Sequence, residues 1–380
     1  MAWDAPDTGM ATTSKKPKRS TLLCDVNPHP RDGVLTFTDW DPVEQKKVHY
    51  YTITATGERV RKSMTGILGE RFDRFDPTAT VDKWYDGWKE DPEGKYYTLI
   101  HYLKLVHEPR LSDDQVKATI LQTWEALGDD ATTEGTAMHQ TIEDFLNGVL
   151  PPPGPGADVP FGVRMVLDMM DVFYPEQQLE PWRVEFPVLY QVRAGDHVEG
   201  LRGREADALI AVGCGLVDAL FRSKKDGRIW MLDWKRVNPK KKSKGLLGVQ
   251  TAAPFRKFAP RPEDMALAPF HEWEAKSFHK YSAQLLGYRH MLIAGGYFTK
   301  EQFAGCFLVQ MHEKHMPKNR AHVVEAADMH AEVAQLFADE TALAVREWSA
   351  KRQALASPLP PKPKAITATT KPKLAKPKRV

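Results

Sequence analysis

Two aspartates and a lysine near the middle of the chain have the types and spacing that could support chemistry. Asp218 lies in the apolar run LVDALF, Asp233 lies in RIWMLDW, and Lys235 follows Asp233 by two residues. A carboxylate inside an apolar strand costs free energy unless a cation or a hydrogen-bonding partner holds it. Two neighbouring carboxylates can bind a hard divalent cation, and a nearby ammonium can orient water or stabilise developing negative charge.

The two apolar runs flank Lys224-Lys225-Asp226-Gly227, and an Asp-Gly step between β-rich runs predicts a hairpin. A two-residue loop at Asp226-Gly227 places Asp218 opposite Lys235, whereas a four-residue loop that begins at Lys224 places Asp218 opposite Asp233. In either register the three residues share one face, because side chains alternate with period two. A three-residue loop would split them across the sheet.

The opposite face of the predicted hairpin is apolar and should pack in the core. It carries Val217, Ala219, Phe221, Trp230, Leu232 and Trp234. Directly opposite residues have Cβ atoms roughly 5 Å apart and diagonal ones about 7–8 Å apart, which is close enough for two carboxylates to share one ion. The competing interpretation is a pair of strand aspartates held by salt bridges alone.

Helical patterns precede the hairpin. Ser112 and Gln115 form a capping box that starts a helix, and Gly128 is a suitable place for that helix to end. A second helix, ATTEGTAMHQTIEDFLNG, places His139 and Glu143 on one face, since they are four residues apart. A histidine beside an apolar stripe is more often structural than a ligand.

Further elements surround the hairpin. The run WRVEFPVLY before it is a strand candidate that contains Glu185, and a helix is expected from 162 to 173. After it we expect a helix from about 274 to 294, with Tyr281, Gln284 and Tyr288 on one stripe. A buried strand at 303–311 and a final helix at 326–352 complete the pattern.

A basic run follows Asp233 directly. It extends from residue 235 to 244 without an acid and consists of Lys235, Arg236, Lys240, Lys241, Lys242 and Lys244. Such a run is usually a solvated loop. Its place immediately after the candidate metal site favours contact with phosphate groups.

The composition of the chain limits the kinds of partner that it can bind. The formal net charge is +3, but residues 351–380 hold nine Lys or Arg and no acid, so the remainder carries a net charge of about −6. Nucleic-acid contact must therefore come from local patches or from the tail. The three cysteines form no CxxC pair, which is typical of a reduced intracellular protein. No run approaches a membrane span, so we expect a soluble protein with no membrane partner.

The composition shifts divide the chain into four parts. Residues 1–32 form a flexible basic tail, and residues 33–128 hold two strand-like runs (33–56) followed by a helical region. Residues 129–352 form the core that carries the candidate site, and residues 353–380 form a disordered Pro/Lys/Ala tail. The run Lys15 to Arg19 could serve nuclear import or be a solvated segment.

Four motifs together resemble the PD-(D/E)XK nuclease superfamily, and most of all its RecB-like exonuclease branch, which includes mitochondrial genome-maintenance exonucleases and related viral and phage nucleases. They are GTAMH (135–139), GLVDAL (215–220), LDWK (232–235) and YSAQLLGY (281–288), and they occur in the order of that branch. The resemblance covers roughly residues 60–315. It implies an α/β restriction-endonuclease-like core, with a mixed central sheet flanked by helices and an N-terminal helical region.

The resemblance implies roles for individual residues. His139, Asp218, Asp233 and the main-chain carbonyl of Trp234 would bind metal, and Asp218, Asp233 and Lys235 would be catalytic. Gln284 and Tyr288 match the QxxxY motif, and Glu143 and Glu185 fall where related proteins carry supporting acids. Val217 stands where many relatives have proline, and the cysteines that hold an iron–sulfur cluster in some relatives are absent, so no cluster is expected.

The implied activity is metal-dependent hydrolysis of phosphodiester bonds in DNA, as an exonuclease acting on single-stranded or frayed ends in replication, repair or recombination. Mg²⁺ suits the carboxylates, and an imidazole ligand makes Mn²⁺ comparatively favourable. The alternatives are a structure-specific endonuclease and a non-catalytic nucleic-acid-binding protein with the same fold. Relatives thread a strand beneath a helical arch, and residues 64–147 could form that cover.

Overall fold

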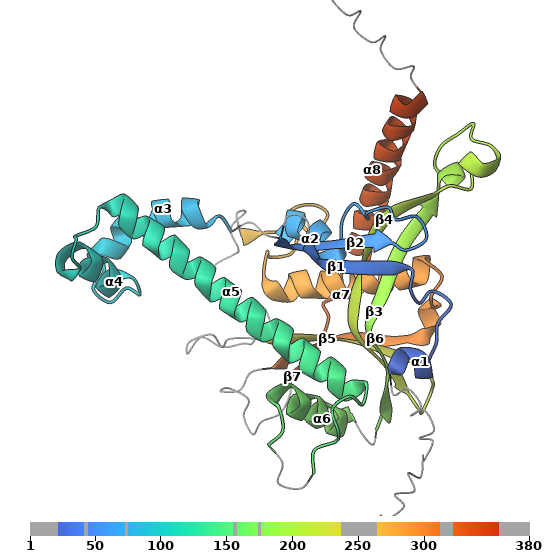
Figure 1. The fold of residues 1–380 in the computed structure, drawn as a ribbon, viewed down its shortest axis with the longest axis horizontal. Helices are drawn as coiled ribbons and strands as arrows, with labels where there is room; N and C mark the ends of the chain where they lie inside the picture. The colour runs from blue at the N-terminus through green and yellow to red at the C-terminus, as the bar shows by residue number, and fades with distance from the viewer. Residues whose placement is uncertain are drawn as a thin grey trace, which may run out of the picture.

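The computed structural model describes residues 22–41, 45–72, 75–154, 158–173, 176–236, 264–311 and 322–356. Its centre is a five-stranded sheet in the order β3-β4-β5-β6-β7 (Figure 1). The strands are β3 (Leu179–Arg193), β4 (Leu209–Ser223), β5 (Ile229–Arg236), β6 (Phe303–Met311) and β7 (His322–Glu325). Only the β5–β6 pair is parallel among the pairs of this sheet that the structure describes. The predicted α/β fold with a mixed sheet and flanking helices is confirmed.

Helices cover both faces of the sheet. One face packs on α7 (Ser277–Ala294), α8 (His330–Ala356) and α2 (Met64–Phe72) through a large core. The other packs on α6 (Phe161–Phe173) and the C-terminal part of α5 (Asp113–Leu146) through a second core. Both faces of β5 are therefore covered, and a charged group on this strand is shielded from solvent.

The expected strands at 33–56 form a separate hairpin. β1 (Leu35–Asp41) pairs antiparallel with β2 (Lys46–Ile53), and the pair packs on the central sheet through Tyr51, Ile53, Leu189 and Cys214. Short 3₁₀ turns at Ala194–Asp196, Gly203–Glu205 and Lys300–Gln302 connect other elements. β7 was not expected, because four residues are too few for a periodic pattern.

The central hairpin adopts the register of the four-residue loop. The Ser223 N–H donates to the Arg228 carbonyl at 2.9 Å, and Ala219 pairs with Leu232. Gly227 has a φ of +73°, the left-handed conformation that glycine adopts without strain. Continued by one step, this register places Asp218 opposite Asp233.

The predicted apolar face of the hairpin is correct except at one position. Ala219, Phe221, Leu232 and Trp234 belong to the α5–α6 core, and Trp230 packs against it. Val217 instead belongs to the α7–α8 core. It lies beyond the last β4–β5 pair, where the two strands separate and the alternation no longer holds strictly.

The prediction that a helix ends at Gly128 is wrong. The Ser112 capping box is present, and the helix that it starts continues without a break from Asp113 to Leu146. A mid-helix glycine costs only about 1 kcal/mol, so packing at both ends of α5 outweighs it. Between these ends, residues 125–134 are all exposed. The boundary placed between 128 and 129 therefore falls inside one helix.

The N-terminal half of α5 belongs to a helical arm that projects from the sheet (Figure 1). The arm also contains α3 (Pro77–Glu90), α4 (Tyr97–His101) and a π-helical turn at Tyr102–Val106. Its own small core includes Val81, Tyr85, Ile100, Leu103, Val116 and Ile120. The chain leaves the main core after α2 and returns to it along α5.

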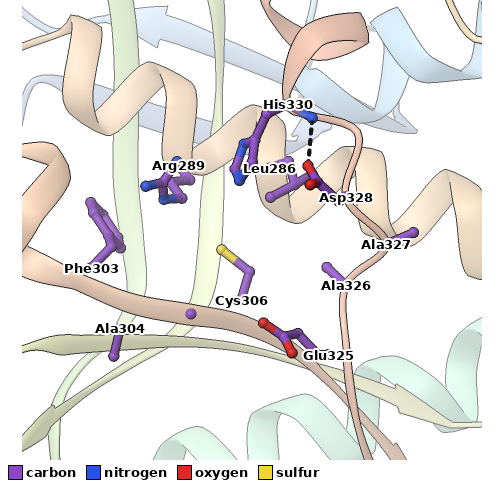
Figure 2. Close-up of a pocket in the computed structure, with 11 residues that line it drawn as sticks. Leu286, Arg289, Phe303, Ala304, Cys306, Glu325, Ala326, Ala327, Asp328 and His330 are labelled. Carbon is purple, nitrogen blue, oxygen red and sulfur yellow. Dashed lines mark hydrogen bonds between the residues drawn. The ribbon is translucent and has the colours of Figure 1, made fainter.

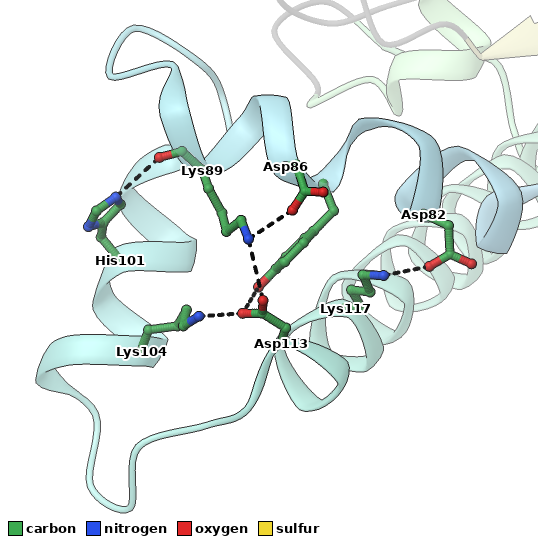
Figure 3. Close-up of polar contacts among 8 residues, drawn as sticks. Asp82, Asp86, Lys89, His101, Lys104, Asp113 and Lys117 are labelled. Atoms are coloured by element: carbon green, nitrogen blue, oxygen red, sulfur yellow. Dashed lines mark hydrogen bonds and ion pairs between the residues drawn. The ribbon is translucent and has the colours of Figure 1, made fainter.

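Asp113 ties three parts of the arm together at the start of α5 (Figure 3). Its carboxylate accepts hydrogen bonds from the Tyr85 hydroxyl at 3.0 Å, from Lys89 at 3.3 Å and from Lys104. The Lys104 ammonium is the main cause that lowers the pKa of Asp113 to about 2.

The expectation of a flexible tail through residue 32 is wrong for residues 22–32. They form α1 (Leu23–Val26) and a turn that packs on β3. The Asn27 side chain donates to the Trp182 carbonyl at 3.0 Å, and Arg183 pairs with Asp32 at 2.6 Å. A buried arginine needs such a partner, and a polar segment supplies it.

Some expectations lie outside the described residues. These are the run Lys15 to Arg19, most of the basic loop after Arg236, and the part of the expected 353–380 tail from 357 onward. The expectation of disorder is wrong for residues 353–356, which form the end of α8 (His330–Ala356). In the described ranges, no helix is both long and apolar enough to cross a bilayer.

Candidate metal centre

The candidate site lies where β4 and β5 separate. Their last pair is Ala219 with Leu232, after which β4 continues beside β3 while β5 continues beside β6. In the opening, the Trp234 N–H donates to Oδ2 of Asp218 at 3.0 Å. The aspartate side chain thus takes the place of a main-chain acceptor, which satisfies a buried N–H and fixes the carboxylate.

Three potential metal ligands meet beside this opening. One ligand atom each from His139, Glu185 and Asp218 lies within 4.8 Å of the others, and all three side chains are partly buried. Nδ1 of His139 is 3.5 Å from Oδ2 of Asp218, and Nε2 is 2.8 Å from the carbonyl oxygen of Trp234. With bonds of about 2.1 Å, the ligands of an octahedral Mg²⁺ are about 3 Å apart when adjacent and about 4.2 Å apart when opposite, so small side-chain movements would let these groups hold one divalent cation.

Glu185 reaches this group from β3. Val184 pairs with Ala219 and Phe186 with Val217, so Glu185 lies opposite Asp218. Its φ is +43°, in the left-handed region that side chains rarely adopt. Such strain persists where the surroundings enforce it, and it is common at binding sites.

Next to the trio, Asp233 and Lys235 form an ion pair in which Asp233 is buried and Lys235 is partly buried. Asp233 is 2% exposed, and its Oδ1 accepts a hydrogen bond from Lys235 Nζ at 3.0 Å. Its Oδ2 makes an ion-pair contact of 2.8 Å with Nζ and accepts no hydrogen bond from the described residues, so this buried oxygen has lone pairs left for a further partner. Asp233 is not a member of the close trio, although it was expected to share the metal with His139 and Asp218.

Burial governs the protonation of these acids. It raises the pKa of Glu185 to about 8, with further contributions from Asp218 and Glu143. It also raises the pKa of Asp233 to about 6, against the opposing effect of Lys235. For Lys235, burial lowers the pKa, but the charges of Asp233 and Asp218 outweigh it and raise the pKa above its ordinary value. The site holds more negative charge than Lys235 can balance, which favours a bound cation.

Glu143 lies one helical turn beyond His139 on α5. Burial is the main cause that raises its pKa, and Asp144 adds to the effect. Gln140 donates to its Oε2 at 3.4 Å. Glu143 is therefore close enough to influence Glu185, as a supporting acid would be, but it is outside the trio.

The two residues of the QxxxY motif pack beneath the site on α7. Gln284 donates to the Tyr288 hydroxyl at 3.3 Å. The Tyr288 ring lies on Gly215 of β4, where an added Cβ would be 2.6 Å from Cε1. Tyr288 is 4% exposed, so in this structure it supports the floor of the site and is not free to contact a ligand.

The basic run is described only at its start. Arg236 pairs with Glu134 of α5 at 2.6 Å, which links the end of β5 to the exposed part of that helix. Lys240, Lys241, Lys242 and Lys244 lie outside the described residues. Their expected contact with nucleic acid stays a prediction.

Sequence reasoning missed two neighbours of Lys235. Its ammonium lies over the Tyr281 ring, 4.5 Å from the centroid, although Tyr281 was expected only as part of a stripe. Gln310 of β6 pairs with Lys235 across the parallel ladder. The sequence did contain a signal for Gln310, because it is the single amide side chain in the otherwise mostly apolar strand FAGCFLVQM.

A separate polar cavity of about 230 Å³ lies between α7, β6 and the start of α8 (Figure 2). Arg289, Cys306, Glu325 and His330 are among its lining residues, and none of the candidate metal ligands is. Burial raises the pKa of Cys306 to about 12, so this cysteine remains a neutral thiol. All three cysteines are free.

Comparisons with known proteins give no name for this arrangement. No family model matches the chain, and no curated protein matches it. Among the solved structures that match, one described as "Crystal structure of SSO0001" is 13% identical, with a TM-score of 0.22. The match covers 48% of this chain and 60% of that chain. This similarity is too low to indicate a function.

Proposed function

We propose that this chain is a divalent-metal-dependent deoxyribonuclease that hydrolyses phosphodiester bonds. The observation that carries the proposal is the meeting of His139, Glu185 and Asp218 within 4.8 Å, directly beside the ion pair of Asp233 and Lys235. A divalent cation at such a site supplies Lewis acidity and an activated water. The RecB-like resemblance of the four motifs adds the expectation of DNA as substrate.

The chain's own groups have separable roles in this proposal. His139, Glu185, Asp218 and the Trp234 carbonyl would hold Mg²⁺ or Mn²⁺, and Oδ2 of Asp233, which is 2.8 Å from the Lys235 ammonium, would face it. Lys235 would orient the attacking water and stabilise negative charge on the phosphate. Its raised pKa keeps it a cation, so it acts through charge and not as a general base.

The electrostatics predict that metal and DNA bind together. Without a cation, the acidic groups Glu143, Glu185, Asp218 and Asp233 disfavour a phosphate at this site, and Lys235 is the described cation closest to them that opposes this effect. The basic residues from Arg236 to Lys244 follow the site directly in sequence and could hold the backbone nearby. DNA affinity should therefore rise when Mg²⁺ or Mn²⁺ is added.

The RecB-like resemblance supports attack from an end, because those relatives thread a strand beneath a helical arch. In this chain the arm leaves the core after α2, turns through α3 and α4, and returns along α5, on which His139 lies (Figure 1). A single strand that is threaded beneath an arch has to present an end, and it fits a narrow passage better than a duplex. We therefore expect an exonuclease that prefers single-stranded or frayed DNA.

The test incubates the purified protein with matched linear and circular single-stranded DNA, first with Mg²⁺ and then with Mn²⁺. The expected result is loss of the linear substrate while the circle survives. Asp233→Asn should abolish cleavage but keep DNA binding. Asp226→Asn is the matched control, because Asp226 lies in the turn of the same hairpin and is paired with Arg228.

The other outcomes point to the alternatives. Equal cleavage of the circular and the linear DNA would favour a structure-specific endonuclease. Tight binding without cleavage of either substrate would favour a non-catalytic nucleic-acid-binding protein. Cleavage by Asp233→Asn at the rate of the parent chain would refute the assignment of the site.

A further inference from the structure

Gln310 lies beside Lys235 on the neighbouring strand. The parallel ladder pairs Asp233 with Leu308 and Lys235 with Gln310. Partners on adjacent strands are about 4.8 Å apart and point to the same face of the sheet. On this face Leu308 belongs to the core beneath α7, and Lys235 lies against Tyr281 of the same helix. The Gln310 amide is therefore part of the surroundings of the Lys235 ammonium.

The Gln310 side chain is fully buried and has no hydrogen-bonding partner. Its exposure is 0%, and neither Oε1 nor Nε2 makes a hydrogen bond to the residues that the structure describes. Burying an unpaired polar group costs roughly 1–3 kcal/mol. A chain that needed only to fill this volume would be more stable with methionine or leucine there. An unpaired amide at this position therefore calls for a functional partner.

Lys235 has a reason to need a neutral acceptor. In the described part of the chain its ammonium contacts the two Asp233 oxygens and the Tyr281 ring. An ammonium has three N–H donors. If a divalent cation binds Asp233, some lone pairs of that carboxylate are occupied, and it can no longer accept all of the hydrogen bonds that Lys235 can donate. The Gln310 oxygen can accept an N–H without neutralising the positive charge that a phosphate would need.

We propose that Gln310 is a positioning residue that accepts a hydrogen bond from Lys235 when a divalent cation engages Asp233. The inference rests on the proposed nuclease function, and it assigns a role to a residue outside the four motifs. Gln310 acts through Lys235 and does not touch the substrate. Its loss should therefore lower kcat and leave KM unchanged.

The test compares three variants of the full chain with the parent. Gln310→Met keeps the volume but removes both polar atoms, and Leu308→Met is a matched control on the same strand and face. Gln310→Asn keeps a neutral amide oxygen as acceptor, on a side chain one methylene shorter. Each is assayed for kcat and KM on linear single-stranded DNA with Mn²⁺, and for the thermal midpoint in a metal-free buffer.

For Gln310→Met we expect kcat to fall about tenfold, the loss of one hydrogen bond to a charged group. Its thermal midpoint should rise by roughly 2 °C, because the unpaired amide is gone. Leu308→Met should change neither quantity appreciably. Gln310→Asn should keep part of the kcat that Gln310→Met loses.

Three results would overturn the inference. An unchanged kcat in Gln310→Met would show that the amide does not serve Lys235. A lower thermal midpoint together with a lower kcat would show a structural role. An equal loss of kcat in Gln310→Asn and Gln310→Met would exclude the acceptor role. If the parent chain itself does not cleave DNA, the proposed function fails, and this inference fails with it.

Discussion

The main-chain N–H of Trp234 donates to Oδ2 of Asp218 at 3.0 Å, across the point where β4 and β5 separate. This bond makes one carboxylate both a structural acceptor and a candidate metal ligand. The two roles can be separated by substitution, because asparagine keeps an acceptor oxygen but not the charge.

Asp218→Asn should fold with a stability close to that of the parent chain and lose the thermal stabilisation given by Mn²⁺. Asp218→Ala should lose that stabilisation too, and should in addition be destabilised by about 1–3 kcal/mol, because the Trp234 N–H is left without an acceptor. Thermal unfolding with and without Mn²⁺ measures both effects. An undiminished Mn²⁺ shift in Asp218→Asn would remove Asp218 from the metal site.

Glu185 should make the metal-free protein less stable at alkaline pH. Burial raises its pKa from 4.5 to about 8, so the folded chain binds this proton more tightly than the unfolded chain does. The contribution of Glu185 to the free energy of unfolding is favourable at low pH and is lost as the pH rises from about 4.5 through about 8. Asp233 contributes in the same direction between 3.8 and about 6.

The thermal midpoint in a chelating buffer should therefore fall between pH 5 and pH 8.5, and Glu185→Gln should remove much of the fall. Glu199→Gln, in an exposed loop after β3, is the control. Parallel pH curves for Glu185→Gln and the parent chain would contradict the prediction.

Asp113 should hold the arm together without affecting the central sheet. Asp113→Ala removes the common acceptor of Tyr85, Lys89 and Lys104, so amide exchange should increase across α4 and the turn at Tyr102–Val106. Asp82→Ala, which breaks the ion pair with Lys117, is the control. Because the pKa of Asp113 is low in the folded chain, the stability that its carboxylate gives to the arm is present above pH 3.8 and is lost as the pH falls toward about 2. Increased exchange in β4 and β5 would show that arm and sheet unfold together.

Two glycines should respond oppositely to substitution by alanine. Gly215→Ala places a Cβ 2.6 Å from the Tyr288 ring, so the ring must move, at a cost of about 1–3 kcal/mol. Gly135→Ala meets nothing within 4 Å on α5 and should stabilise the chain by about 0.5–1 kcal/mol. Denaturant unfolding measures both. A neutral Gly215→Ala would show that Tyr288 can leave its place without cost.

Local patterns in the sequence determined most of the elements. Alternation placed Asp218, Asp233 and Lys235 on one face of a hairpin, because a period of two is a property of any extended strand. The Ser112 capping box started α5 at the expected residue, since a cap depends on neighbours in the chain. The mixed α/β class followed from the succession of helical and strand-like runs.

Only the tertiary structure decided which residues meet. Two loop lengths were compatible with Lys224 to Gly227, and the structure has the four-residue loop, whose register ends at the pair of Ala219 with Leu232, where the strands separate. Gly128 has a low helix propensity and therefore predicts a helix end. In the structure α5 continues past Gly128, because both ends of this helix are packed and stabilise it. Glu185, Asp218 and His139 come from β3, β4 and α5, and their convergence depends on long-range pairing that no local pattern encodes. Gln310 shows the same limit: its polarity is visible in the sequence, but its place beside Lys235 exists only once β5 and β6 pair in parallel.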